Sequence, residues 1–197
     1  MTENLRQKQK RLTRENLIDT AFKLFAQNGL TTTRTVDIAK AANVSHGTVF
    51  AHFSTQEELL TAVIEEFGKK VTQRIHELVD LKKTTTLREV LEAHLTGLKE
   101  FEAFYTRLIV ERRLLPQSVK NMYIVIQSTI SFHIGLVGER EMAQGNIRKM
   151  PVHLLYNTWI GLIHYYLSNS DIFSPDGSVL KLKSPELLEH YMGIITP

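Results

Sequence analysis

The chain has 197 residues, of which 43% are hydrophobic, and it has no cysteine and a formal net charge of +3. The apolar fraction is enough for a buried core and excludes a wholly disordered chain, and the lack of cysteine excludes disulfide bonds, cysteine-ligated zinc and thiol nucleophiles. Residues 1–55 carry a net charge of +4 and residues 56–197 a net charge of −1, which favours a polyanion as the partner of the first segment.

Three helices are predicted in the first 55 residues. Apolar residues recur at helical spacing over 13–28, and Gly29 follows at the position where a helix can end. Two short helices are predicted over 35–42 and 46–53. Asn43 lies between them, where the chain must turn sharply, and asparagine tolerates left-handed backbone better than most residues.

Six further helices are predicted after residue 55, which makes about nine in total and an all-α fold. The first is a long connector over 56–80. The others are expected at 86–98, 101–115, 119–138, 152–168 and 185–195, with an irregular loop at 169–183. We expect two domains: a DNA-binding domain over 1–55, with a basic arm at 1–11, and a helical bundle over 56–197.

The two short helices have the properties of a helix-turn-helix. Small residues such as Ala39 and Ala42 allow a close crossing, and apolar residues such as Ile38 and Val49 attach the pair to the first helix. The exposed start of the second short helix is then free to meet base edges in a major groove. Backbone N–H groups at both helix starts can bind phosphate.

The segment 35–59 resembles the DNA-binding signature of the tetracycline-repressor (TetR) family. The matching positions are Thr35, Ile38, Ala39, Ala42, Val44, Ser45, Gly47, Thr48, His52, Phe53, Glu57 and Leu59. Three positions depart from the family pattern: Asn43 replaces the usual turn glycine, Phe50 a frequent tyrosine, and Gln56 a frequent lysine. The resemblance implies double-stranded DNA as a partner, with these contact residues: Arg34, Thr35, Ser45, His46, Gly47, Thr48, Phe50, His52 and Gln56.

The resemblance also implies a cavity for a small-molecule effector inside the helical body. The candidates are polar or amphipathic side chains within apolar helices: His94, Tyr105, Tyr123, Gln127, His133, Asn157 and Trp159. Tyr156 has the same character. Taken singly, each is better explained by ordinary buried packing. No HExxH pattern or neighbouring carboxylate indicates a metal site at the histidines, so no metal or cofactor is predicted.

The helix over 152–168 is apolar almost all round, so we expect a second copy of the chain to cover part of it. The family's last two long helices form such a dimer interface. The expected interface residues are Leu155, Trp159, Ile163, Leu188, Tyr191 and Ile195. The alternative is a central core helix in a monomer.

These observations predict a homodimeric, ligand-responsive transcriptional regulator, most simply a repressor that an effector releases from a palindromic operator. The alternative is a helical ligand-binding or adaptor protein without DNA binding. No nucleophile elbow, phosphate-binding glycine loop or catalytic carboxylate pair indicates an enzyme. The N-terminus is polar and no apolar stretch is long enough to span a bilayer, so a cytoplasmic protein without membrane contact is expected.

Overall fold

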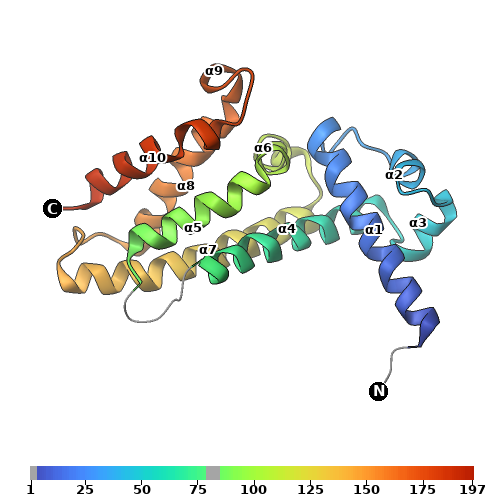
Figure 1. The fold of residues 1–197 in the computed structure, drawn as a ribbon, viewed down its shortest axis with the longest axis horizontal. Helices are drawn as coiled ribbons and strands as arrows, with labels where there is room; N and C mark the ends of the chain where they lie inside the picture. The colour runs from blue at the N-terminus through green and yellow to red at the C-terminus, as the bar shows by residue number, and fades with distance from the viewer. Residues whose placement is uncertain (1–3, 79–84) are drawn as a thin grey trace. The chain divides into compact units, whose positions relative to one another are not determined.

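The computed structural model describes residues 4–78 and 85–197, and these are helical almost throughout, with no strand among them (Figure 1). The all-α prediction is therefore confirmed. The α-helices are α1 (Leu5–Asn28), α2 (Thr35–Ala41), α3 (His46–His52), α4 (Gln56–Leu78), α5 (Leu87–Glu100), α6 (Glu102–Glu111), α7 (Gln117–Gln144), α8 (Val152–Ser168), α9 (Ser170–Phe173) and α10 (Val179–Ile195). A single 3₁₀ turn, Arg112–Leu114, follows α6.

The chain forms two compact units. Unit 1 contains residues 1–67 and 103–123, and unit 2 contains residues 68–102 and 124–197. The first unit thus takes in α6 and the start of α7 as well as the three N-terminal helices. The expected division at 55/56 concerns function, and it remains a prediction.

Unit 1 is built around a helix-turn-helix. Gly29 ends α1 with φ of 99°, and Asn43 makes the turn between α2 and α3 with φ of 55°, as the sequence predicted. Helix α2 packs against both α1 and α3 (Figure 1). Aromatic side chains from α6 complete this core, because Phe22 of α1 stacks on Phe104 at 4.3 Å between ring centroids.

Helix α1 is longer than predicted, since it begins at Leu5 and not near Thr13. Asn4 is the N-cap. Its side-chain oxygen accepts a hydrogen bond from the Arg6 N–H, and its own backbone N–H donates to Gln7 Oε1. This reciprocal capping box supports a helix start in a polar segment that lacks an apolar stripe. The segment 5–11 is therefore helical and not an irregular arm.

Unit 2 is a bundle in which α10 packs against both α5 and α8. Trp159 of α8 and Tyr191 of α10 are almost fully buried there. The Tyr191 hydroxyl donates to the Leu155 carbonyl, and burial raises the pKa of that phenol. Among the described residues, no helix is both long and apolar enough to cross a membrane.

The last helix also begins earlier than predicted, at Val179, so the expected loop at 169–183 contains α9 and the first turn of α10. Glu102 explains the difference. Its carboxylate accepts the N–H groups of Val179 at 2.7 Å and Leu180 at 3.2 Å, which lack partners within the helix. Pro185 lies inside α10, where it removes one backbone hydrogen bond.

Candidate nucleic-acid interface and ligand groove

The start of α3 is an exposed and locally braced surface. Ser45 caps the helix, because its Oγ accepts the Thr48 N–H at 3.1 Å and lies 2.8 Å from the Thr48 Oγ1. His46 and Gly47 are exposed, and Phe50 is 46% exposed. These side chains reach solvent from the first turns of a helix whose turn and cap are fixed.

Helices α2 and α3 are also joined through their side chains. Thr35 Oγ1 and His46 Nε2 are 2.9 Å apart, and the His46 ring meets Phe50 edge to face at 4.9 Å. Arg34 is exposed at the N-cap position of α2. The predicted contact residues Arg34, Thr35, Ser45, His46, Gly47, Thr48 and Phe50 therefore lie together at the starts of the two short helices.

His52 and Gln56 are less open than the other predicted contact residues, because Gln56 is hydrogen-bonded within the chain and His52 is half-buried. The Gln56 amide donates to the Thr33 carbonyl at 2.9 Å, which ties the start of α4 to the segment before α2. His52 is half-buried, and its Nδ1 is buried without a hydrogen-bond partner among the described residues. Burial lowers the pKa of His52, and the charges of Lys10 and Arg14 lower it further. A neutral His52 supplies no positive charge near neutral pH.

Because the charges of Lys10 and Arg14 lower the pKa of His52, these two basic groups of α1 lie near the end of α3. The Arg14 guanidinium sits 4.9 Å from the Phe53 ring centroid, in cation–π range. Arg6, Lys8, Lys10 and Arg11 are exposed along the first turns of α1, and Arg11 pairs with Glu15 at 2.9 Å. Cationic side chains of α1 thus lie near the C-terminal end of α3.

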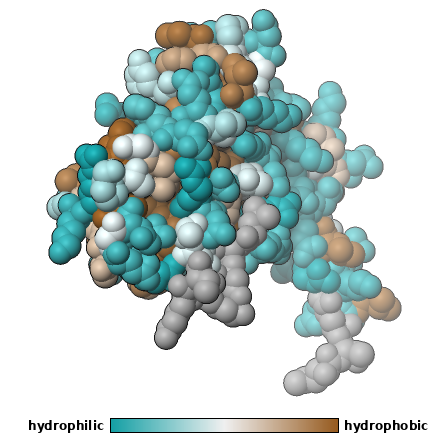
Figure 2. Space-filling view, turned by 60° about the vertical axis from the view of Figure 1, so that its left-hand side comes forward, coloured by the Kyte–Doolittle hydropathy of each residue, from teal (hydrophilic) through white to brown (hydrophobic). Residues whose placement is uncertain are grey.

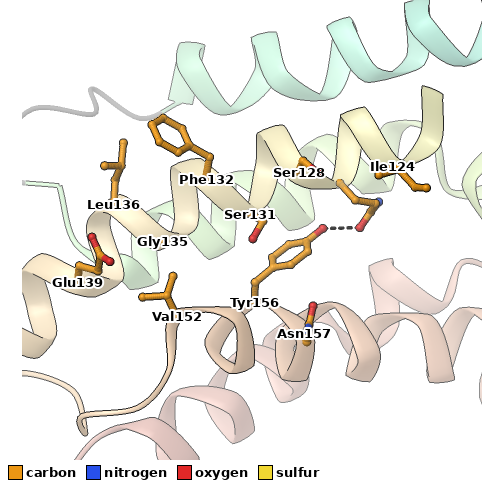
Figure 3. A pocket seen from close by; sticks show the side chains of 11 residues that line it. Ile124, Ser128, Ser131, Phe132, Gly135, Leu136, Glu139, Val152, Tyr156 and Asn157 are labelled. Atoms are coloured by element: carbon orange, nitrogen blue, oxygen red, sulfur yellow. Dashed lines mark hydrogen bonds between the residues drawn. The ribbon is translucent and has the colours of Figure 1, made fainter. Parts of the chain in front are cut away.

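A groove lies between α7 and α8 in unit 2 and has a volume of about 510 Å³ (Figure 3). Tyr156 reaches from α8 toward α7, and its hydroxyl donates to Gln127 Oε1. Asn157 also lines the groove. Two of the predicted pocket residues, Gln127 and Asn157, therefore meet at this site.

The other five predicted pocket residues do not line this groove. His94 and Trp159 are joined in the core of unit 2, where the Trp159 Nε1–H donates to His94 Nδ1 at 3.1 Å. Burial lowers the pKa of His94 to about 3, with a smaller contribution from His164. These two residues pack against each other in the interior.

Tyr105 and Tyr123 belong to unit 1 and are nearly fully buried there; burial raises the pKa of Tyr123. His133 is half-buried and meets the His76 ring at 5.0 Å. Burial lowers the pKa of His133, and His76 adds to that effect. Among the described residues, no group of three or more histidine or acidic side chains is placed to hold a metal ion.

The groove contains residues that the sequence reasoning missed. They lie on one face of α7 at helical spacing: Ser128, Ser131, Phe132, Gly135, Leu136 and Glu139. The sequence does contain a pattern that could have indicated them, because small and polar residues recur beside apolar ones along 124–139. The face that α8 would turn toward α7 was not available from the sequence.

All six predicted dimer-interface residues are buried within the single chain, at 5% exposure or less. Leu155, Trp159 and Ile163 form a buried face of α8. There the Leu155 carbonyl accepts from Tyr191 of α10, and Trp159 donates to His94 of α5. The exposed face of α8 carries other residues, including Leu154, Gly161 and Tyr165, and that of α10 carries Leu182 and Gly193. On the face drawn in Figure 2, hydrophobic residues also lie at the surface among hydrophilic ones.

The family model for bacterial regulatory proteins of the tetR family matches residues 17–63. An HTH-type transcriptional repressor of Mycobacterium tuberculosis is 40% identical over 60 residues, which cover 30% of this chain and 32% of the relative. A probable acrEF/envCD operon repressor of Escherichia coli is 30% identical over 140 residues, which cover 70% of this chain and 54% of the relative. The matched segments thus span about a third to about half of the length of these relatives.

The likeness to solved structures extends over nearly the whole chain. The transcriptional regulator FadR of Bacillus subtilis, solved in complex with stearoyl-CoA, has a TM-score of 0.75 and 21% identity. The alignment covers 90% of this chain and 97% of that structure. At this identity the likeness supports a shared fold, and it does not extend the ligand to this chain.

Proposed function

Because its N-terminal segment belongs to the tetR family of bacterial regulatory proteins, we propose that this chain is a DNA-binding transcriptional repressor that a small molecule releases from its operator. The observation that carries the proposal is the exposed start of α3, with His46, Gly47 and Phe50 open to solvent beside a capped turn. Side chains at this position of a helix-turn-helix read base edges in the major groove.

The basic turns of α1 supply the electrostatic part of the same interface. Lys8 and Lys10 are exposed, and cations of this kind bind phosphates without reading sequence. The backbone N–H groups at the starts of α2 and α3 add neutral phosphate contacts. Phosphate contacts would supply affinity and α3 would supply sequence specificity, and an operator-binding protein needs both.

We propose a homodimer in which a second copy covers the exposed face of α8 and α10. Leu154 and Tyr165 on α8 and Leu182 on α10 are 47%, 60% and 61% exposed, and such side chains favour burial against a partner. Two-fold symmetry would place two heads on one side of the duplex and would match a palindromic site, with half-sites about 34 Å apart.

The effector of the proposed mechanism is a small molecule bound in the body of the chain, and the site of action is the cytoplasm. The FadR structure with stearoyl-CoA is a regulator of this fold with a bound ligand. Helices α4 and α7 each contribute residues to both units. We infer that movement of these two helices alters the spacing of the heads, with a coupling of about 1–3 kcal/mol between ligand and DNA.

Selection of bound fragments from a genomic library tests the function, followed by affinity measurements on the selected site. His46→Ala with Thr48→Ala is expected to weaken specific binding by roughly 30-fold or more, because two base contacts worth about 1–3 kcal/mol each are removed. Ser45 still caps α3 through the backbone of residue 48, so the fold is retained. The matched control is His76→Ala with Thr96→Ala, two exposed positions in unit 2.

If the His46→Ala, Thr48→Ala variant loses specific and non-specific binding equally, α3 does not read the bases. Lys8→Gln with Lys10→Gln should lower the slope of log affinity against log salt by about 1–2, since each phosphate contact contributes about 0.9. The competing function is a helical ligand-binding or adaptor protein. It is favoured if no fragment is retained, and the internal hydrogen bond of Gln56 would then be part of the explanation.

A further inference from the structure

The groove between α7 and α8 has the size and the composition of a small-molecule site. Its volume of about 510 Å³ lies within the range of about 300–1,000 Å³ that such sites occupy. Residues 124–139 of α7 line it from end to end, and at 1.5 Å per residue this corresponds to a length of about 22 Å. A ligand of at least ten carbon atoms can lie along it.

One wall of the groove is apolar and open to solvent. Ile124, Phe132 and Leu136 are 57%, 62% and 50% exposed, and all three come from the same helix (Figure 3). Exposed apolar side chains gathered in a concave site are covered favourably by an apolar ligand. This wall therefore favours a ligand with an apolar body.

The polar groups of the groove determine which head group the ligand carries. Among the residues that the structure describes, Glu139 is the one carboxylate that lines it, and no lysine, arginine or histidine does so. An anion would lose hydration here without a cation to compensate it. A cation would be attracted by Glu139 and by the face of Phe132, since aromatic rings bind cations at about 6 Å or less.

The remaining polar side chains are neutral and already partly engaged. Tyr156 donates its hydroxyl proton to Gln127, so these two neutral side chains are bonded to each other in the lining of the groove. Ser128, Ser131 and Asn157 complete the polar lining. These groups offer hydrogen bonds without supplying positive charge, which again disfavours a carboxylate, sulfate or phosphate head.

We propose that this groove binds a lipophilic monocation, such as an amine or quaternary ammonium on an apolar body, and that this is the ligand class of the effector site. The inference rests on the proposed function for its regulatory meaning. The binding itself is independent of DNA and is measured without it.

Calorimetric titration of the full chain with three probes tests the proposal. Decyltrimethylammonium, 1-decanol and decyl sulfate share one tail and differ in head charge, and each is used below its micelle concentration. The cation is expected to bind about three- to fivefold more tightly than the alcohol and about tenfold or more over the sulfate, the scale expected for one exposed carboxylate. Glu139→Gln should reduce binding of the cation to the level of the alcohol and leave the alcohol unchanged.

Two matched controls accompany these variants. Glu92→Gln makes the same charge change at an exposed site on α5 and should alter none of the three affinities. Ser128→Trp fills the groove from its exposed rim and should abolish binding of both the cation and the alcohol. Thr96→Trp, also exposed on α5, should leave binding intact.

Equal binding of the three probes, preference for decyl sulfate, or an unchanged cation affinity in Glu139→Gln would each overturn the proposal. So would a Ser128→Trp chain that binds normally. If Ser128→Trp changes the sedimentation of the chain from dimer to monomer, the groove is an interface between copies, and the proposal is wrong. DNA binding that persists beside a failed titration would leave the proposed function standing.

Discussion

The histidine buried in the core of unit 2 makes the stability of the chain depend on pH. Trp159 donates its Nε1–H to Nδ1 of His94 at 3.1 Å, so the remaining proton of the neutral ring is on Nε2. That atom is buried and has no hydrogen-bond partner among the described residues. The folded chain therefore resists protonation at His94, and burial lowers the pKa of this residue from 6.5 to about 3.

The sign of the effect follows from proton binding in the two states. Below pH 6.5 the unfolded chain binds a proton at His94, whereas the folded chain does not until about pH 3. The free energy of unfolding therefore falls by about 1.4 kcal/mol for each pH unit in this window. Between pH 7.5 and 4.5 this residue alone should remove about 3 kcal/mol.

Substitution by asparagine isolates this contribution. In His94→Asn the side-chain oxygen can still accept from Trp159, but the group no longer titrates. The free energy of unfolding is measured with urea and circular dichroism at pH 7.5 and 4.5. The difference between variant and wild type should shift by about 3 kcal/mol in favour of the variant at the lower pH. His153→Gln, an exposed position on α8, is the matched control and should keep the wild-type profile. A His94→Asn difference that is the same at both pH values would refute the reasoning.

Glycine positions in the helices and the extent of unit 1 give two further predictions. Gly138→Ala should destabilise the chain by about 1–3 kcal/mol in urea unfolding, because the added Cβ would lie 2.3 Å from Leu155 Cδ2. In Gly97→Ala the added Cβ meets only ordinary contacts at 3.5 Å, so this variant should be about 0.5–1 kcal/mol more stable than the wild type. Equal effects of the two substitutions would contradict the difference in packing. A fragment of residues 1–67 should show no cooperative melting by circular dichroism, because it lacks Phe104 and the rest of the core from α6; a sharp transition like that of the full chain would contradict this.

The helix-turn-helix could be predicted closely because its determinants are local. The capping side chain of Ser45, the left-handed residue Asn43 and the helix stop at Gly29 are all observed where the sequence predicted them. Each acts within a few residues of the chain. The exposure of His46 follows from the same local pattern.

The errors occurred where distant residues decide the structure. Helix α10 begins at Val179 because Glu102, 77 residues earlier, accepts its first N–H groups. The predicted dimer residues are buried because unit 2 covers one face of α8 itself. An apolar helix shows that burial is required, but its sequence does not show whether the same chain or a partner provides it.

The same distinction applies to the basic segment at the start of the chain. The sequence located the positive charge of this segment. It did not distinguish a flexible arm from a helix, because both would have the same composition there. The capping box at Asn4 makes the segment helical, and the effect of Lys10 on the pKa of His52 means that its charge lies near the end of α3. A cation held on a helix needs less ordering on binding than one on a flexible arm. For this reason the helical start of α1 favours phosphate contacts that are already in position when α3 meets the bases.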